Sequence, residues 1–296
     1  MEKEYWLVIL CGFLSGLLVF GGKVFSEMGL SLYQISVFPS LMSTLLLFPY
    51  FLAKKGYKME RKTAGLFVLM GLVIAFVVLA QYGSVIVGTP VAVTVLLLYT
   101  QPVWTIIFSK VFLKERISKM KLVATAIVLA GMAIIVNPLQ IQGLGGFTGI
   151  FLALGGGFFL AGWTVIGRVF GKKNYDPVMT KFVATFVSIL FLLALYPAIS
   201  WFSNDRTITG MGFDLPFKIW VYLFLFEVFA AIIPQVSYYI GTRKVSASDA
   251  GIILLLEPVS ASLLAMAFLG QALTANVIVG GALILLANYL VIREKV

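Results

Sequence analysis

The chain has 296 residues, of which 61% are hydrophobic and only 11% are charged. Soluble domains hold about 45–50% apolar and about 25% charged residues, so this composition excludes a soluble globular fold and indicates a protein embedded in lipid. The formal net charge of +10 would also suit a nucleic-acid-binding protein, so the positions of the cations have to decide between the two.

Ten apolar runs follow one another along the chain, and each is long enough to cross a bilayer core of about 30 Å as a helix. They cover residues 5–22, 32–52, 64–83, 91–110, 119–137, 147–167, 177–199, 217–241, 247–269 and 274–292. A membrane barrel would instead show short alternating strands. The first run lacks a basic flank and a cleavage site, so we interpret it as a helix and not as a signal peptide. The expected fold is an all-α integral membrane protein with ten transmembrane helices.

The cations predict the topology, because the connections between ten spans alternate between the two sides of the membrane. All 22 Lys and Arg residues except Lys23, Arg206 and Lys218 fall at one side. Cations near helix ends stay in the cytoplasm, so both termini are expected inside the cell membrane. Topology and contact with anionic lipid then account for the net charge, and nucleic acid is not an expected partner.

The uncharged gap NPLQIQGLGG at 137–146 separates the fifth run from the sixth. We take residues 1–137 as a first five-helix repeat, 138–146 as a linker and 147–296 as a second repeat. An odd number of spans in each half places the second half upside down relative to the first. The expected architecture is therefore a pair of inverted repeats, as in many secondary transporters.

The clearest evidence for the repeat is a sequence segment that occurs in two similar copies, at 94–118 and at 250–274. The two copies align in constant register, and the cluster KER of the first copy becomes GQA in the second. Loss of cations in one copy is what opposite membrane orientation would produce. The matched pairs are Gln101 with Glu257, Pro102 with Pro258, Glu115 with Gln271, and Tyr82 with Tyr238.

These two segments, QPVWTIIFSKVFLKERIS and EPVSASLLAMAFLGQALT, resemble the EamA repeat of the drug/metabolite transporter superfamily. The resemblance extends over nearly the whole chain. It implies a ten-helix transporter with a central cavity lined mainly by helices 1, 3, 4, 6, 8 and 9. Members of the superfamily move amino acids, nucleotide sugars, organic cations and other metabolites, so the resemblance does not name a substrate. At Gln271 the chain departs from the pattern, which commonly has Glu there.

Two acids lie at membrane depth, where ionisable groups are costly and usually face a cavity. Glu227 and Glu257 each stand about ten residues into a span, and Gln101 is the repeat mate of Glu257. We expect these residues to bind the amine of a substrate or a coupling proton. The structural alternative is that Glu257 braces the kink at the proline that follows it. Glu227 is the stronger candidate, because its repeat mate is Gly71.

Deep aromatic and amide side chains complete the predicted substrate site, since aromatic rings attract ammonium groups. Interfacial belts or helix packing are the alternatives for the aromatic residues. The candidates are Tyr82, Tyr99, Trp104, Trp163, Gln235 and Tyr238. Lys23 and Arg168 end the first and sixth spans at equivalent places. They are interpreted either as snorkelling anchors or as a gate for a carboxylate.

We therefore expect a secondary active or facilitative transporter of a small amphipathic metabolite, an amino acid or amine, working by alternating access with export as the expected direction. A nucleotide sugar or a drug cation is the alternative cargo, and an intramembrane enzyme or a channel is a more distant one. No cofactor and no metal are expected, because the chain has no His, a single Cys11 and no GxxxxGK motif. The expected partners are the small-molecule substrate, a coupling proton and membrane lipid, and either a monomer or a homodimer is expected.

The cation asymmetry predicts that both termini and the connections at 53–63, 111–118, 169–176 and 243–246 are cytoplasmic. Single cysteines introduced at Lys58 or Lys173, in a Cys11→Ala background, should resist a membrane-impermeant thiol reagent added to intact cells. A cysteine at Lys218 should react. Strong labelling at Lys58 or Lys173 would overturn the topology.

Overall fold

The computed structural model describes residues 2–54, 61–137, 146–270 and 273–294. Ten segments of these residues are long and apolar enough to cross a membrane, which confirms the predicted all-α membrane fold. Six of the ten are α1 (Lys3–Glu27), α2 (Leu32–Ala53), α3 (Arg61–Ile86), α6 (Lys119–Val136), α7 (Phe147–Lys172) and α14 (Ala275–Arg293). A seventh is α8 (Pro177–Phe202), and a short helix, α9 (Arg206–Thr209), follows it.

The remaining three spans are interrupted. Span 4 consists of α4 (Val91–Leu98) and α5 (Gln101–Phe112). Span 8 consists of α10 (Phe217–Phe226), a π-helix (Glu227–Ile232) and α11 (Ile233–Gly241). Span 9 consists of α12 (Ala247–Ile253) and α13 (Leu256–Leu269). Hydrophobicity alone shows these spans as continuous apolar runs, and only the prolines at 102, 234 and 258 indicate interruptions in the sequence.

Prolines explain where the three spans are interrupted, because proline lacks the amide that would donate to the carbonyl four residues earlier. Pro102 and Pro258 stand just after the breaks in spans 4 and 9, at matched positions of the repeat. Pro234 follows the π-helix of span 8, and π-helical turns are frequent at functional sites. The matched breaks fit two repeats, whereas the inverted orientation and the division at 138–146 stay predictions.

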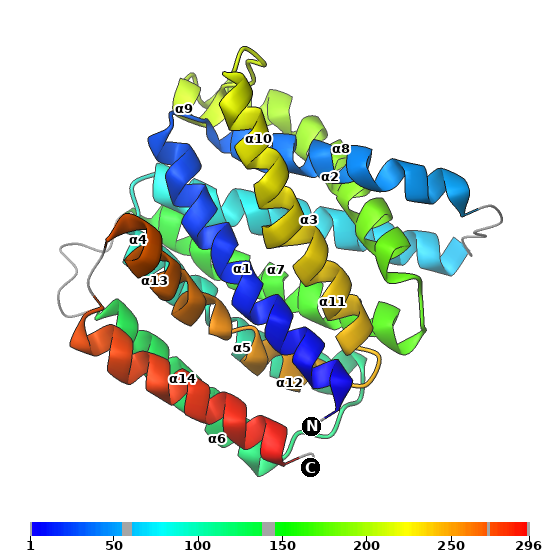
Figure 1. The fold of residues 1–296 in the computed structure, drawn as a ribbon, viewed down its shortest axis with the longest axis vertical. Helices are drawn as coiled ribbons and strands as arrows, with labels where there is room; N and C mark the ends of the chain where they lie inside the picture. The colour runs from blue at the N-terminus through cyan, green and yellow to red at the C-terminus, as the bar shows by residue number, and fades with distance from the viewer. Residues whose placement is uncertain (1, 55–60, 138–145, 271–272, 295–296) are drawn as a thin grey trace.

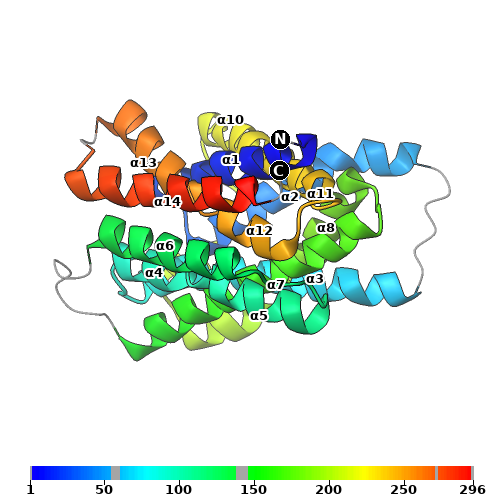
Figure 2. The ribbon, with the colours of Figure 1, turned by 90° about the horizontal axis from the view of Figure 1, so that it is seen from below.

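The two halves of the chain pack crosswise (Figures 1 and 2). Helix α1 of the first half packs against α11 and α13 of the second half. Helix α7 of the second half packs against α3, α4 and α5 of the first half. Helices α6 and α14 pair with each other at one edge of the molecule, where they carry exposed apolar side chains toward the lipid. The start of α1 and the end of α14 lie at the same end of the molecule.

Two glycines let these crossing helices reach the broken spans. A Cβ atom on Gly157 of α7 would lie 2.7 Å from the carbonyl oxygen of Leu98, at the break of span 4. A Cβ atom on Gly12 of α1 would lie 2.8 Å from the carbonyl oxygen of Ile253, at the break of span 9. Backbone therefore packs directly on backbone at both breaks, in the manner of small-residue helix contacts in membranes.

Asp176 fixes the start of α8. Its carboxylate caps the helix by accepting hydrogen bonds from the amides of Val178 and Met179, both at 3.0 Å. It also binds Lys54 at the end of α2, with Nζ and Oδ2 2.6 Å apart. Partial burial raises the pKa of Asp176, but the hydrogen bonds from Lys54 and from the Met179 amide outweigh it and leave this pKa below its usual value. Asp176 thus stays charged and holds the first turns of α8 in register.

The close approach at Gly157 predicts a difference between two neighbouring glycines of α7. Gly157→Ala should lower the melting temperature, because the new methyl group collides with the Leu98 carbonyl, and such overpacking costs about 1–3 kcal/mol. Gly155→Ala is the control, since a Cβ atom there meets nothing within 4 Å and alanine favours the helix by about 1 kcal/mol. Thermal unfolding in detergent measures both. Equal melting temperatures for the two variants would show that α7 does not pack as described.

Candidate functional site

A cavity of about 150 Å³ lies where the three interrupted spans meet. Span 4 contributes Tyr99 and Gln101 beside its break, and span 9 contributes Leu255 and Glu257 beside its own. The first residue of the π-helix, Glu227, also lines it. Side chains of α1, α3 and α7 complete the expected lining, and α2 and α8 contribute as well, which the family resemblance did not imply.

Seven of the predicted substrate residues line this cavity, and two do not. The seven are Tyr82, Tyr99, Gln101, Trp163, Glu227, Gln235 and Glu257. Trp104 packs edge-to-face against Phe158, with ring centroids 5.6 Å apart, outside the cavity lining. Tyr238 is fully buried behind Trp163 and donates a hydrogen bond of 2.6 Å to the carbonyl of Thr164. Lys23 belongs to α1, but its side chain is outside the described part of the structure.

Gln101 uses both of its amide donors to hold the break of span 4. Its Nε2 donates to the hydroxyl of Thr105, one turn further along α5, at 3.0 Å. It also donates to the hydroxyl of Thr164 on α7 at 3.0 Å. This residue therefore joins span 4 to span 6, and only its carbonyl oxygen remains for a ligand.

Glu257, the repeat mate of Gln101, has a different environment. Its carboxyl group lines the cavity close to the hydroxyl of Tyr99. That hydroxyl is buried and is in hydrogen-bond geometry with no described side chain. No cation pairs with Glu257 among the described residues. A carboxylate in such a place needs a proton or a cationic ligand to balance it.

Glu227 is not alone in the cavity, because Lys181 of α8 pairs with it. Their Nζ and Oε1 atoms are 3.2 Å apart, and the two side chains are only 5% and 4% exposed. The sequence interpretation missed Lys181 by counting it among the cations of a cytoplasmic connection. A local signal could have corrected this, since Asp176-Pro177 is a typical helix start and places Lys181 more than one turn inside the span.

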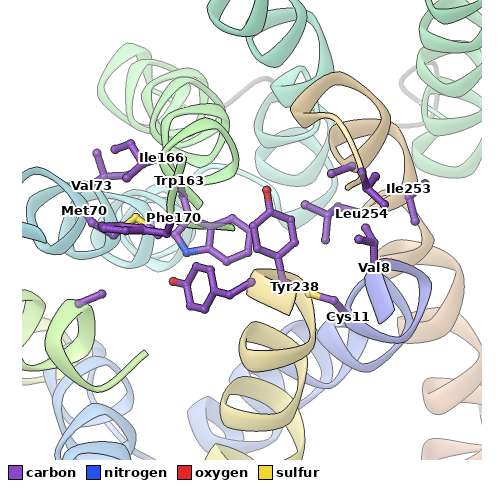
Figure 3. Close-up of a cluster of buried hydrophobic side chains, with 14 of the residues drawn as sticks. Val8, Cys11, Met70, Val73, Trp163, Ile166, Phe170, Tyr238, Ile253 and Leu254 are labelled. Carbon is purple, nitrogen blue, oxygen red and sulfur yellow. The ribbon is translucent and has the colours of Figure 1, made fainter. Parts of the chain in front are cut away.

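A cluster of buried apolar side chains, drawn in Figure 3, adjoins the cavity. Trp163 and Leu254 line the cavity and also belong to this cluster. Trp163 stacks on Tyr238 with ring centroids 4.5 Å apart. Val8 and Phe170 belong to the same cluster and lie nearer to the ends of α1 and α7 that carry the cations. This cluster, which we call the apolar plug, therefore lies between the cavity and the helix ends that are predicted to be cytoplasmic.

A polar network lies beyond the plug, and Arg168 is part of it. The Glu115 carboxylate accepts a hydrogen bond of 3.1 Å from the amide of Ala247, and so caps the start of α12. It also pairs with Arg168 Nε at 3.4 Å. Arg168 donates in addition to the Thr242 carbonyl at the end of α11. These contacts tie spans 4, 6, 8 and 9 together, and Arg168 is not among the residues that line the cavity.

A second buried ion pair strengthens the same end of the molecule. Lys121 Nζ of α6 lies 2.8 Å from Asp249 Oδ1 of α12. It donates to the hydroxyls of Ser246 and Ser248 at 2.9 and 2.8 Å. The hydroxyl of Tyr5 on α1 donates to the other Asp249 oxygen at 3.3 Å. Both members of this pair therefore have hydrogen-bond partners beyond each other, although Asp249 Oδ1 itself meets only the Lys121 ammonium.

In the described ranges, no three acidic or cysteine side chains come close enough together to hold a metal ion. The polar groups of the cavity lining are two acids, one lysine, three glutamine amides, the hydroxyls of serine, threonine and tyrosine side chains, and the indole of Trp163. Such a set can bind a small ligand that has a cationic group and an apolar body.

Comparisons with known proteins agree with this architecture. The model of the EamA-like transporter family matches residues 2–137 and 147–293. An uncharacterized transporter of Clostridium kluyveri is 24% identical over 97% of this chain and 92% of its own length. An uncharacterized transporter of Archaeoglobus fulgidus is 29% identical over 74% of this chain and 73% of its own length.

Two further matches extend the comparison. The uncharacterized transporter YwfM of Bacillus subtilis is 31% identical over 59% of this chain and 55% of its own length. A solved structure, described only as "Crystal structure of protein", superposes with a TM-score of 0.76 over 97% of this chain and 98% of that one. At 14% identity, the similarity to this solved structure shows a shared fold alone.

The position of Glu115 predicts that its loss weakens the contacts that join spans 4, 6 and 9. Glu115→Ala should lower the melting temperature, because α12 loses its carboxylate cap and Arg168 loses its ion partner, together about 1–2 kcal/mol. Glu294→Ala is the control: it removes an exposed acid whose hydrogen bond, 2.8 Å from the Ser118 hydroxyl, is open to solvent, so the melting temperature should fall much less. A Glu115→Ala protein as stable as the Glu294→Ala protein would contradict the assigned role.

Proposed function

Because the chain belongs to the EamA-like transporter family, we propose that it carries a small amphipathic metabolite with an amino group across the cell membrane by alternating access. Membership of this family, within the drug/metabolite transporter superfamily, makes the protein a multi-pass membrane transporter and not an enzyme. We propose an amino acid or amine as the cargo and export as the net direction of transport.

The charge of the cavity is the observation that best supports the proposed cargo. Two acids face one lysine there, so a negative charge remains when all three are ionised. The remaining charge lies on Glu257, which has no described cation beside it. In an apolar cavity, a bound amine or a coupling proton would balance it. Trp163, Tyr82 and Tyr99 offer rings that favour an ammonium group or an apolar side chain.

A nucleotide sugar fits this cavity less well. Phosphate groups are usually bound by several Arg or Lys side chains. The described lining has one such cation, Lys181, and Glu227 already neutralises it. The same charges therefore favour a cargo with an amine over a cargo with phosphates.

Alternating access would use the broken spans as hinges. The breaks of spans 4 and 9 stand beside the cavity at matched positions, and each is covered by a helix from the other half. Rocking of one half against the other would separate the plug and the polar network on one side while the opposite side closes. The proposal thus treats Glu115 and Arg168 as a gate that opens in the other state.

Glu257→Gln keeps the size of the side chain and removes the unbalanced charge. Transport of amino acids or amines in proteoliposomes should fall by at least about tenfold, the effect of losing one charge-assisted hydrogen bond, or should lose its pH dependence. The melting temperature should be equal or higher, because a buried unpaired carboxylate is removed.

Glu294→Gln serves as the control, since this acid is exposed near the end of α14. Parent rates for Glu257→Gln across about pH 5–8 would remove Glu257 from the mechanism. Stabilisation by nucleotide sugars, with none by any amine or amino acid, would refute the proposed cargo.

A further inference from the structure

The Lys181–Glu227 pair leaves most of its hydrogen-bonding capacity unused. A lysine ammonium has three donors, and Lys181 makes one polar contact with the described side chains, at 3.2 Å to Glu227 Oε1. Neither carboxylate oxygen of Glu227 accepts a hydrogen bond from the described residues: buried Oε1 has only the Lys181 ammonium beside it, and the nearby hydroxyl of Ser43 is not in hydrogen-bond geometry. Both residues line the cavity, and each side chain keeps a small exposed fraction, so a ligand in the cavity can reach them.

The Lys121–Asp249 pair shows what a purely structural ion pair looks like in the same protein. It is equally buried, with side chains 3% and 0% exposed. Ser246, Ser248 and Tyr5 supply the additional hydrogen bonds that a buried pair needs to offset the loss of water. Lys181 and Glu227 have no such hydrogen bonds among the described residues, although their desolvation is similar. Stability alone therefore does not explain why this pair is kept in the cavity wall.

We propose that the Lys181–Glu227 pair is the site for the head group of a zwitterionic α-amino acid. Lys181 binds the carboxylate of the substrate with its free donors, and Glu227 Oε2 accepts from the substrate ammonium. An α-amino acid carries its ammonium and carboxylate groups on neighbouring carbon atoms. Its two charges can therefore lie beside the Lys181–Glu227 pair in the opposite order, and the lysine and glutamate need not move apart. This inference rests on the proposed function, because it selects amino acids from the wider class of amine-bearing cargo.

Charge balance supports this assignment. The pair is neutral and so is the zwitterion, so binding adds no net charge to the cavity. Glu257 is then left for the coupling proton, because the substrate amine is bound elsewhere. The side chain of the amino acid would face the apolar part of the lining, which includes Leu18, Ile35 and Val77. A simple amine would use only Glu227 and would leave the donors of Lys181 unpaired.

The test compares ligands that differ only in one charged group. The standard amino acids are screened by thermal shift on the purified full-length protein in detergent. The one that stabilises most is then compared with its decarboxylated amine and its N-acetyl derivative. The amino acid should bind more tightly than both. Lys181→Met should lower the affinity for the amino acid by at least about tenfold and change that for the amine little, whereas Lys181→Arg should keep the preference.

Controls separate binding from folding. If Lys181→Met alone does not fold, because Glu227 is left unpaired, Lys181→Met with Glu227→Gln removes both charges and should fold yet lose the preference for the amino acid. Lys121→Met with Asp249→Asn removes the structural pair and should reduce stability while the preference is kept.

Two outcomes distinguish this inference from the proposed function. Binding of amines with no preference for the matching amino acid, or a preference that survives Lys181→Met, would overturn the inference and leave the proposed function standing. The absence of binding by any amine or amino acid would overturn both.

Discussion

In a bilayer, every backbone amide and carbonyl must find a partner inside the protein, and the arrangement of this structure depends on that constraint. A helix satisfies its own backbone, so seven of the ten spans are simple helices. The three interrupted spans leave backbone groups exposed and can exist only where protein, and not lipid, surrounds them. Their breaks therefore converge on the interior, and the cavity lies where they meet.

The same constraint explains the crosswise packing of the two halves. A broken helix needs a close neighbour, and the closest neighbour available is a helix face without side chains. Gly12 of α1 lies against the break of span 9, and Gly157 of α7 lies against the break of span 4. Each half thus supplies the helix that packs against a broken span of the other half, so neither half contains the whole wall of the cavity. A cavity shared in this way changes shape whenever the halves move.

The sequence predicted features that depend on composition and on single strong signals. Ten apolar runs predicted ten spans, and Pro258 predicted a kink in span 9, whose matching break in span 4 stands before the repeat mate Pro102. The sequence could not predict which side chains face the cavity, because both sides of a membrane helix are apolar. Trp104 and Trp163 are both tryptophans at membrane depth, yet only Trp163 faces the cavity. Lys181 was missed because a cation near a helix end has the same sequence signature whether it snorkels outward or reaches inward.

The charges of the cavity all come from the second half of the chain. Lys181, Glu227 and Glu257 follow residue 147, whereas the first half contributes the neutral side chains Gln101, Tyr99 and Tyr82. Two identical repeats would share the charges equally, so the second copy has become the one that carries ionisable groups. Ligand charges bound there would keep the head of the cargo attached to the second half. The first half would then move past the apolar part of the cargo, where no ion pair has to break during the transition.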